Sequence, residues 1–461
     1  MAVSVSLGEC LGRWSHLAAR SGFGALLLLA TSIGCTEEAA KETADAEVEA
    51  AATSADIELS QSVEGSGSAG TVSGTHQQVR LIKPTNDEPG LMLKSFCLMP
   101  DGKLLALVDG GAPVWGGIPT FGSTPDGKAP GCEVRIIDQE GNKVHSFPVD
   151  FSGHSVNVGS DGNIYVGGNG IVAKFDPTGK QLIQTASPNM SADSQTEEVL
   201  RQRAMETLTE QKAAYAEALA TLEKQQKEME GKSDDELTEE QRESKLMMEP
   251  MITAYKQAMA QYNEPSEEQI KQIVESLSSR QKTINAIAVN DKYVFVTCAA
   301  SKGYGYSVWR TDLDFQNPAM IVDGLRGCCG QMDVQCCGEE LVVAENSRHR
   351  VVRYDAEGKE VLTFGKRSRD GVGEGFGSCC NPMNTRLVGD NLYVAESDGN
   401  VKLFSQDGKF LNLVGKADVQ AGCKSSIVAA SPDGERVYYF DVQKSGICVL
   451  EKVPAATEAT P

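Results

Sequence analysis

Short runs of alternating apolar and polar residues, separated by tight-turn signals, recur along the C-terminal part of the chain. The run LVVAE (Leu341–Glu345) follows a turn at Gly338, and the run LYVAE (Leu392–Glu396) follows a turn at Gly389. In both places a third run comes next, and a Glu-Gly or Asp-Gly turn then leads to a fourth. Two-residue turns of this kind between alternating runs are the strongest hairpin signal that a sequence offers. The pattern therefore predicts repeated units of four antiparallel strands.

The best-preserved copies of this unit resemble NHL repeats. The resemblance is carried by VAENSRHRVVRYDAEG (Val343–Gly358), the glycine-rich FGKRSRDGVGEGF (Phe364–Phe376) and VAESDGNVKLFSQDG (Val394–Gly408). With the weaker copies included, the chain holds about six units. The resemblance implies an all-β fold, namely a six-bladed β-propeller of four-stranded blades. It also implies that Gln78–Pro84 adds a strand to the last blade and closes the ring, which leaves no long free edge.

A segment with helical periodicity interrupts the predicted blades. We expect blades 1 and 2 over 78–188, an α-helical hairpin insertion over 189–281, and blades 3 to 6 over 282–453. Apolar residues such as Leu208 and Leu222 recur in the insertion at close to helical spacing. The insertion is either a self-packed structural element or an arm that binds a partner or pairs two copies as a coiled coil. Four methionines would suit an adaptable contact, although methionine in a helix is more often core: Met247, Met248, Met251 and Met259.

The N-terminus predicts export. The apolar run Gly22–Ala30 is too short to span a bilayer comfortably and ends in small residues, which is typical of a signal peptide over residues 1–35. The following SIGC resembles a bacterial lipoprotein cleavage box, which implies a lipid on Cys35 and a membrane-anchored protein facing the periplasm or the cell surface. The alternative is secretion without an anchor. Residues 36–77 are acidic and lack aromatic residues, so a disordered linker is expected there, and a disordered tail is expected over 454–461.

The charge of the chain narrows the choice of partners. The chain has 43 Lys and Arg against 64 Asp and Glu, a formal net charge of −21 at pH 7. Such an acidic surface disfavours nucleic acids and anionic membranes as partners. It is compatible with cationic ligands or metal ions, although solubility alone is a sufficient reason for it.

Cysteines gather in the last three predicted blades. Counting back from the hairpin turns places Cys329, Cys380 and Cys423 at equivalent positions, where the innermost strand of each blade begins. Cys328 and Cys379 lie beside two of them. Because the innermost strands of a propeller surround its channel, the register predicts a cluster at one channel mouth. The same register adds thioethers and carboxylates to this cluster: Met332, Met383, Glu345, Glu396 and Asp441.

Three interpretations of this cluster remain open. Exported chains form disulfides readily, and links between blades would stiffen a ring. Thiolates and thioethers also suit copper(I), and thiolates with a carboxylate suit zinc. The third interpretation is redox chemistry at a Cys-Cys pair, although the chain has no C-x-x-C motif. Cys336 and Cys337, at the other end of their hairpin, add a vicinal disulfide or links to neighbouring loops as further alternatives.

The sequence offers no catalytic motif in the required context: no nucleophile elbow, phosphate-binding loop or dinucleotide fingerprint. We expect three histidines in the propeller, His145, His154 and His349, and His154 opens an inner strand, so it is a candidate ligand at the channel. We therefore predict a non-enzymatic binding or scaffold propeller that recognises a protein, peptide or carbohydrate on a loop face. The alternative is a protein that binds copper or zinc, or an enzyme, using the cysteine cluster.

Overall fold

The structure is a computed structural model that describes most of the chain from Gly74 onward. The described residues are 74–110, 131–190, 196–233, 236–261, 265–300, 305–328, 330–368, 371, 373–378, 380–422 and 424–454. They divide into a helical unit over Glu197–Glu275 and a β unit formed by the described residues before and after it. The expected signal peptide with Cys35 and nearly all of the expected linker lie outside the described residues. Within the described part of the chain, no helix is long and apolar enough to cross a membrane.

The β unit is built from four-stranded antiparallel sheets, and the described residues form six of them. The first three sheets are β2–β5 (Met92–Leu98, Leu104–Asp109, Cys132–Ile137, Lys143–Val149), β6–β9 (Ser155–Val158, Ile164–Gly168, Ile171–Phe175, Gln181–Ala186) and β10–β13 (Ile284–Val289, Tyr293–Ala299, Tyr306–Asp312, Ala319–Leu325). The next two are β14–β17 (Asp333–Cys337, Glu340–Glu345, Arg350–Tyr354, Glu360–Phe364) and β20–β23 (Asn384–Val388, Asn391–Ala395, Asn400–Ser405, Phe410–Lys416). The last sheet joins β24–β26 (Val428–Ala430, Arg436–Asp441, Gly446–Lys452) to β1 (His76–Ile82), and a short parallel pair, β18 (Lys366–Arg367) and β19 (Gly375–Phe376), lies between two sheets in sequence.

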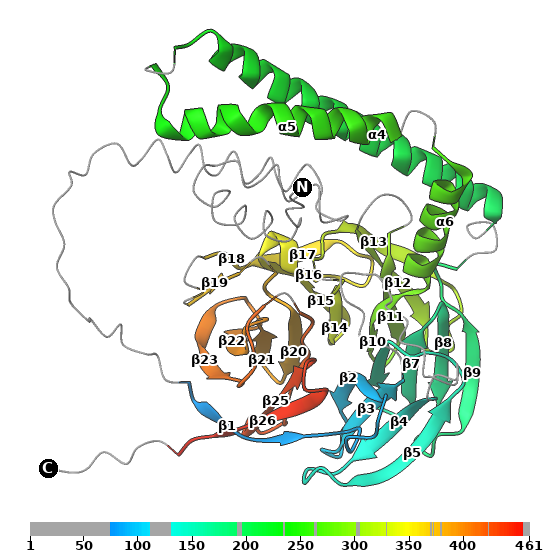
Figure 1. Ribbon diagram of the computed structural model, residues 1–461. Coiled ribbons are helices and arrows are strands. Elements are labelled where there is room, and N and C mark those ends of the chain that lie inside the picture. The colour runs from blue at the N-terminus through cyan, green and yellow to red at the C-terminus, as the bar shows by residue number, and fades with distance from the viewer. Residues whose placement is uncertain are drawn as a thin grey trace, which may run out of the picture. The chain divides into compact units, whose positions relative to one another are not determined.

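The sheets of the β unit form a ring (Figure 1). The first strands of consecutive sheets contact one another in a closed cycle, from β2 through β6, β10, β14, β20 and β24 back to β2. This arrangement confirms the prediction of an all-β propeller built from four-stranded units. The hairpin registers also agree with the sequence, because Cys337 pairs with Glu340 and Val388 pairs with Asn391.

The first described strand closes the ring. β1 pairs antiparallel with β26 and becomes the outermost strand of the last sheet, as the resemblance implied for Gln78–Pro84. The strand starts at His76, so the linker expected over 36–77 ends earlier than predicted. The reason is the buried ring of His76, whose Nε2 lies 2.9 Å from the carbonyl oxygen of Gly434 and holds the start of β1 on the sheet. His76 is thus a further propeller histidine, beyond the three that the sequence indicated.

Each pair of neighbouring sheets encloses its own hydrophobic core. Leu105 and Leu107 of the first sheet, for example, pack with Val156, Ile164 and Val166 of the second. Similar clusters lie between the other neighbouring sheets of the described chain. Because both faces of a sheet are covered in this way, the middle strands are apolar almost throughout, and every residue of β3 is buried.

The two ends of the strands differ in how they are connected. At one end, which we call the turn face, the connections are short, and an aspartate orders many of the turns between third and fourth strands. Each of these aspartates accepts hydrogen bonds from the backbone N–H groups two and four residues later: Asp138, Asp176, Asp312 and Asp355. The other end, which we call the loop face, carries the long connections: 110–131, 187–283, 300–305, 326–332, 365–383 and 417–427.

The helical unit contains a hairpin of two long helices. Its helices are α4 (Glu197–Glu230), α5 (Glu239–Gln261) and the first part of α6 (Glu267–Lys282), whose last residues belong to the β unit. All three helices lie within the insertion expected over 189–281 except for the last residue of α6. Tyr215 of α4 meets Tyr255 of α5 edge to face, with ring centroids 5.7 Å apart. α6 begins with a capping box, because Ser266 Oγ accepts the N–H of Gln269 while the side chain of Gln269 accepts the N–H of Ser266.

Candidate functional site

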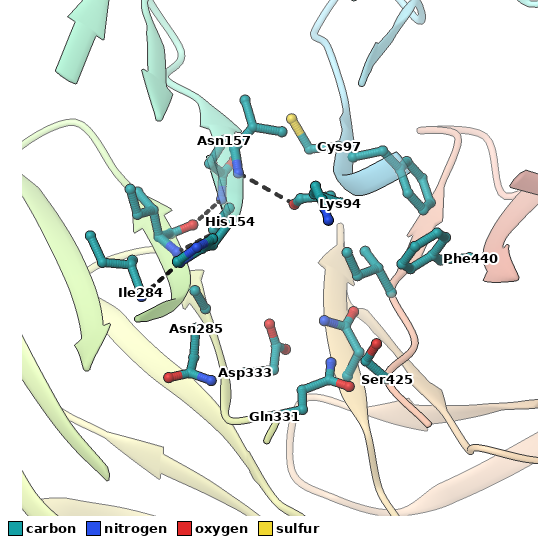
Figure 2. A pocket seen from close by; sticks show the side chains of 18 of the residues that line it. Lys94, Cys97, His154, Asn157, Ile284, Asn285, Gln331, Asp333, Ser425 and Phe440 are labelled. Atoms are coloured by element: carbon teal, nitrogen blue, oxygen red, sulfur yellow. Dashed lines mark hydrogen bonds between the residues drawn. The ribbon is translucent and has the colours of Figure 1, made fainter. Parts of the chain in front are cut away.

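The first strands surround a cavity on the axis of the β unit, and this channel is the candidate site. Its volume is about 120 Å³, which is enough for several water molecules. Side chains from the first strand of all six described sheets line it. Figure 2 shows Lys94 and His154 at the cavity, with Asp333 and Gln331 across from them. His154, which the sequence places at the start of an inner strand, lines this cavity, and its role as a ligand stays a prediction.

Polar side chains of the first strands hydrogen-bond to the backbone of the next first strand. Ser155 Oγ accepts the N–H of Ile287 at 3.0 Å, and Asn384 Oδ1 accepts the N–H of Val428 at 2.9 Å. The same kind of link joins three further pairs: Val156 N–H to Ser95 Oγ, Ile284 N–H to His154 Nδ1, and Thr385 N–H to Asp333 Oδ2. Side chain to backbone hydrogen bonds thus join consecutive sheets around the channel.

These links explain why the channel is polar. A first strand has no neighbouring strand of its own sheet on the channel side, so that edge presents backbone groups that need partners. The side chains of the preceding strand supply several of those partners. Gln331 reaches further and bonds to both backbone groups of Ser426, accepting its N–H at 3.0 Å and donating to its carbonyl oxygen at 2.7 Å. Much of the polar lining therefore has a structural purpose that requires no ligand.

Removing one link should destabilise the β unit. Asn384→Ala leaves the buried N–H of Val428 without its acceptor, so we expect the free energy of unfolding to fall by about 1–3 kcal/mol. Urea denaturation followed by circular dichroism measures this change. Asn391→Ala, at the exposed far end of the same hairpin, is the matched control and should have little effect. Equal losses in the two variants would contradict a specific role for the link.

Besides the Cys97 thiol, four ionisable side chains line the channel: Lys94, His154, Asp333 and Arg386. Burial lowers the pKa of His154 to about 4, and the charge of Lys94 acts in the same direction, so the imidazole is neutral at pH 7. Burial raises the pKa of Asp333 to about 6, against the hydrogen bonds and the nearby Arg386 that favour its ionised form. Burial also lowers the pKa of Lys94. The channel therefore shifts the pKa of its ionisable groups strongly, as ligand sites often do.

The three predicted channel-mouth carboxylates do not line the cavity. Each is buried and forms an ion pair with a basic side chain of its own sheet or of the adjoining turn. The pairs are Glu345 with Arg348 and Arg350 (2.9 and 2.6 Å), Glu396 with Lys402 (3.1 Å) and Asp441 with Lys444 (3.5 Å). They lie at the ends of second strands, as the register predicts, and basic residues of the next strand or turn hold them there, so their gathering with the cysteines at the channel mouth stays a prediction.

The predicted sulfur cluster is described only in part. Met332 is buried in the core between the third and fourth sheets, and the Sδ of Met383 lies 3.7 Å from Nδ2 of Asn346. Neither methionine lines the channel cavity. Of the cysteines in the cluster, Cys328 is partly exposed and Cys380 is buried. Cys329, Cys379 and Cys423 lie outside the described residues, so the convergence of these cysteines stays a prediction.

Six other cysteines are free thiols: Cys97, Cys132, Cys298, Cys336, Cys337 and Cys448. The vicinal pair Cys336 and Cys337 therefore forms no disulfide. Burial raises the pKa of Cys97, Cys132 and Cys298 to about 12, so these thiols stay protonated and unreactive at neutral pH. Within the described residues no group of three or more His, Cys, Asp or Glu side chains is placed to hold a metal ion, and the copper or zinc alternative gains no support there.

Sequence reasoning did not identify Lys94, Asp333 and Arg386 as residues of the channel. A signal was present, because each stands within a predicted first strand whose role is to pack against its neighbours. A charged residue at such a position needs a partner or an aqueous cavity. The spacing of the repeat does not show which residues of a neighbouring sheet lie against these side chains, such as Gln335 against Arg386.

Comparisons with known proteins assign this chain to no family and no function. No model of a known protein family matches the chain, and no curated protein matches it. Among solved structures, a WD40 domain of Pan2 from Neurospora crassa is similar, with 9% identity and a TM-score of 0.39 over 84% of this chain and 98% of that one. A protein of unknown function from Bacteroides caccae has 12% identity and a TM-score of 0.38 over 74% and 87%. One of unknown function from Desulfotomaculum acetoxidans has 9% identity and a TM-score of 0.34 over 67% and 69%.

Proposed function

We propose that this protein is a non-enzymatic binding propeller of the NHL type, held outside the cytoplasm by a lipid on Cys35. Its ligand is a protein, peptide or carbohydrate, and the binding surface is the loop face of the β unit. The strongly acidic composition argues against nucleic acid as the ligand.

The observation that carries the proposal is the contrast between the turn face and the loop face. The turn face is held by short turns in which aspartates such as Asp138 and Asp355 satisfy the backbone internally. The long connections all leave from the loop face, including the one that contains the helical unit. Binding residues concentrate on loops that a rigid scaffold positions, and long loops in a compact domain are more often functional than short ones.

The hydrogen bonding in the channel favours a binding function over an enzymatic one. The polar groups that an enzyme would aim at a substrate are largely engaged with the backbone here. His154, for example, uses Nδ1 to accept the N–H of Ile284, and Asn157 bonds to the carbonyl oxygen of Ile287. The described residues around the cavity thus act first as links between sheets.

A selection experiment tests the loop face. The full chain is screened against a phage-displayed peptide library and a glycan array, and the ligands obtained are titrated against two triple-alanine variants. We expect affinity to fall by about tenfold or more in the loop-face variant and to stay unchanged in the turn-face variant. The loop-face variant replaces Arg367, Asp418 and Gln420, and the turn-face variant replaces Glu140, Glu357 and Asp390, all of them exposed. Failure of both screens, or loss of binding in the turn-face variant alone, would contradict the proposal.

A further inference from the structure

Arg386 is a channel residue whose charge has no directly bonded counter-ion among the described residues. It stands in β20 and lines the cavity. The one hydrogen bond that it makes with a described residue runs from Nη1 to the neutral amide oxygen of Gln335, at 3.0 Å. Other arginines of the β unit contact carboxylates directly, such as Arg350 with Glu345 and Arg353 with Glu340. Several N–H groups of the Arg386 guanidinium are therefore left for another acceptor.

The carboxylate of Asp333, which also lines the channel, already accepts hydrogen bonds from other residues. Asp333 Oδ1 accepts a hydrogen bond from Gln335 Nε2 at 3.0 Å, and Asp333 Oδ2 accepts the N–H of Thr385 at 3.0 Å. Gln335 thus stands between the carboxylate and the guanidinium, donating to the first and accepting from the second. Asp333 lowers the net positive charge of the channel, but Gln335 separates its carboxylate from the guanidinium, and the two groups do not bond to each other.

The thiols beside Arg386 do not supply the missing charge either. Arg386 lies close enough to Cys97 and Cys336 to favour their thiolate forms, but burial outweighs this effect and raises the pKa of both thiols to about 12. Both thiols are therefore protonated at neutral pH. Cys97 belongs to β2 and Cys336 to β14, so these neutral groups flank Arg386 from two further strands.

We propose that the channel binds a small oxyanion at Arg386. A guanidinium with open N–H groups matches the two oxygens of a carboxylate or phosphate group, and such charge-assisted pairs are strong in a partly dehydrated cavity. The volume of about 120 Å³ limits the ligand to a few heavy atoms, such as a free anion or the end group of a larger molecule that enters from the loop face. This site is separate from the loop-face surface, and either can exist without the other.

Equilibrium dialysis of the full chain against labelled sulfate and labelled formate, at pH 7 and low ionic strength, tests the proposal. Sulfate stands for tetrahedral anions such as phosphate, and formate stands for planar carboxylates, so the tighter of the two identifies the class of ligand. We expect saturable binding of one anion per chain. In Arg386→Gln the dissociation constant should rise by about tenfold or more. Arg436→Gln is the control, since Arg436 is an arginine outside the channel that pairs with Glu451.

A charge-relocation variant separates anion binding from folding. Asp333→Asn combined with Gln335→Glu keeps the net charge and both hydrogen bonds, but it places the carboxylate directly on the Arg386 guanidinium. The variant should fold with an unchanged circular dichroism spectrum and should lose saturable binding, because the new carboxylate occupies the site. The proposal is overturned if the wild-type chain binds neither anion saturably. It is also overturned if Arg386→Gln or the relocation variant binds as tightly as the wild type.

Discussion

Replacing Glu396 with alanine is expected to lower the free energy of unfolding by about 3–5 kcal/mol. Glu396 and Lys402 are each 2% exposed, and the Lys402 Nζ lies 3.1 Å from the carboxylate. Without Glu396, the ammonium of Lys402 keeps the carbonyl oxygen of Gly375 and the ring face of Phe376 as partners, but no counter-charge in the pair. An uncompensated buried charge is costly, and urea denaturation at pH 7 measures the loss.

Two further variants show that the charge, rather than the lost volume, is the cause. The double variant Glu396→Leu with Lys402→Met removes both charges and keeps apolar volume, so it should lose much less stability than Glu396→Ala. Glu435→Ala breaks an exposed pair with Lys452 and should leave the transition unchanged. If the double variant is as unstable as Glu396→Ala, the effect comes from packing and the explanation is wrong.

Asp333 and His154 should give opposite pH dependences of stability. The folded-state pKa of Asp333 is raised to about 6, so its ionisation destabilises the fold, and stability should increase as the pH falls from 6 towards 4. The folded-state pKa of His154 is lowered to about 4. The unfolded chain therefore takes up this proton first, and stability should decrease as the pH falls from 6.5 towards 4. Each effect amounts to about 3 kcal/mol, and the two largely cancel in the wild type.

Single variants make the two contributions visible. In Asp333→Asn only the histidine effect remains, so stability relative to wild type should fall by about 3 kcal/mol between pH 6.5 and 4. In His154→Asn the aspartate effect remains, and relative stability should rise by a similar amount over the same range. Chemical denaturation at a series of pH values gives both difference curves. Parallel curves for the two variants and the wild type would show that neither group titrates as inferred.

Much of the fold is predictable from the sequence because local patterns determine it. The glycine turns at Gly338 and Gly389 fix the register of two hairpins, and the observed pairing of Cys337 with Glu340 follows directly. The apolar content of each strand follows from burial on both faces. The start of β1 was placed too late, because the hydrogen bond that holds His76 on the last sheet comes from Gly434, at the other end of the chain.

The channel was less predictable because its contacts join separate sheets. The link from Asn384 to Val428 depends on how two sheets stack, and nothing in the spacing of the repeat specifies it. The carboxylates were a different case, because basic residues stand near them in the sequence. Glu345 pairs with Arg350 across the hairpin of β15 and β16, and Arg348 and Arg350 follow it within five residues, so an ion pair could have been inferred from the sequence.

The closure of the ring by β1 also bears on how the chain acquires its structure. β1 is the first described strand in sequence, and its partner β26 is the last. Pairing between such distant segments has a large entropic cost of loop closure and forms late. The ribosome synthesises His76–Ile82 long before β26, the strand with which it pairs. During synthesis the backbone N–H and C=O groups of β1 are therefore unpaired and can bind to another chain. A C-terminal truncation that removes β26 should therefore leave β1 without its partner strand, and the truncated chain should self-associate through β1.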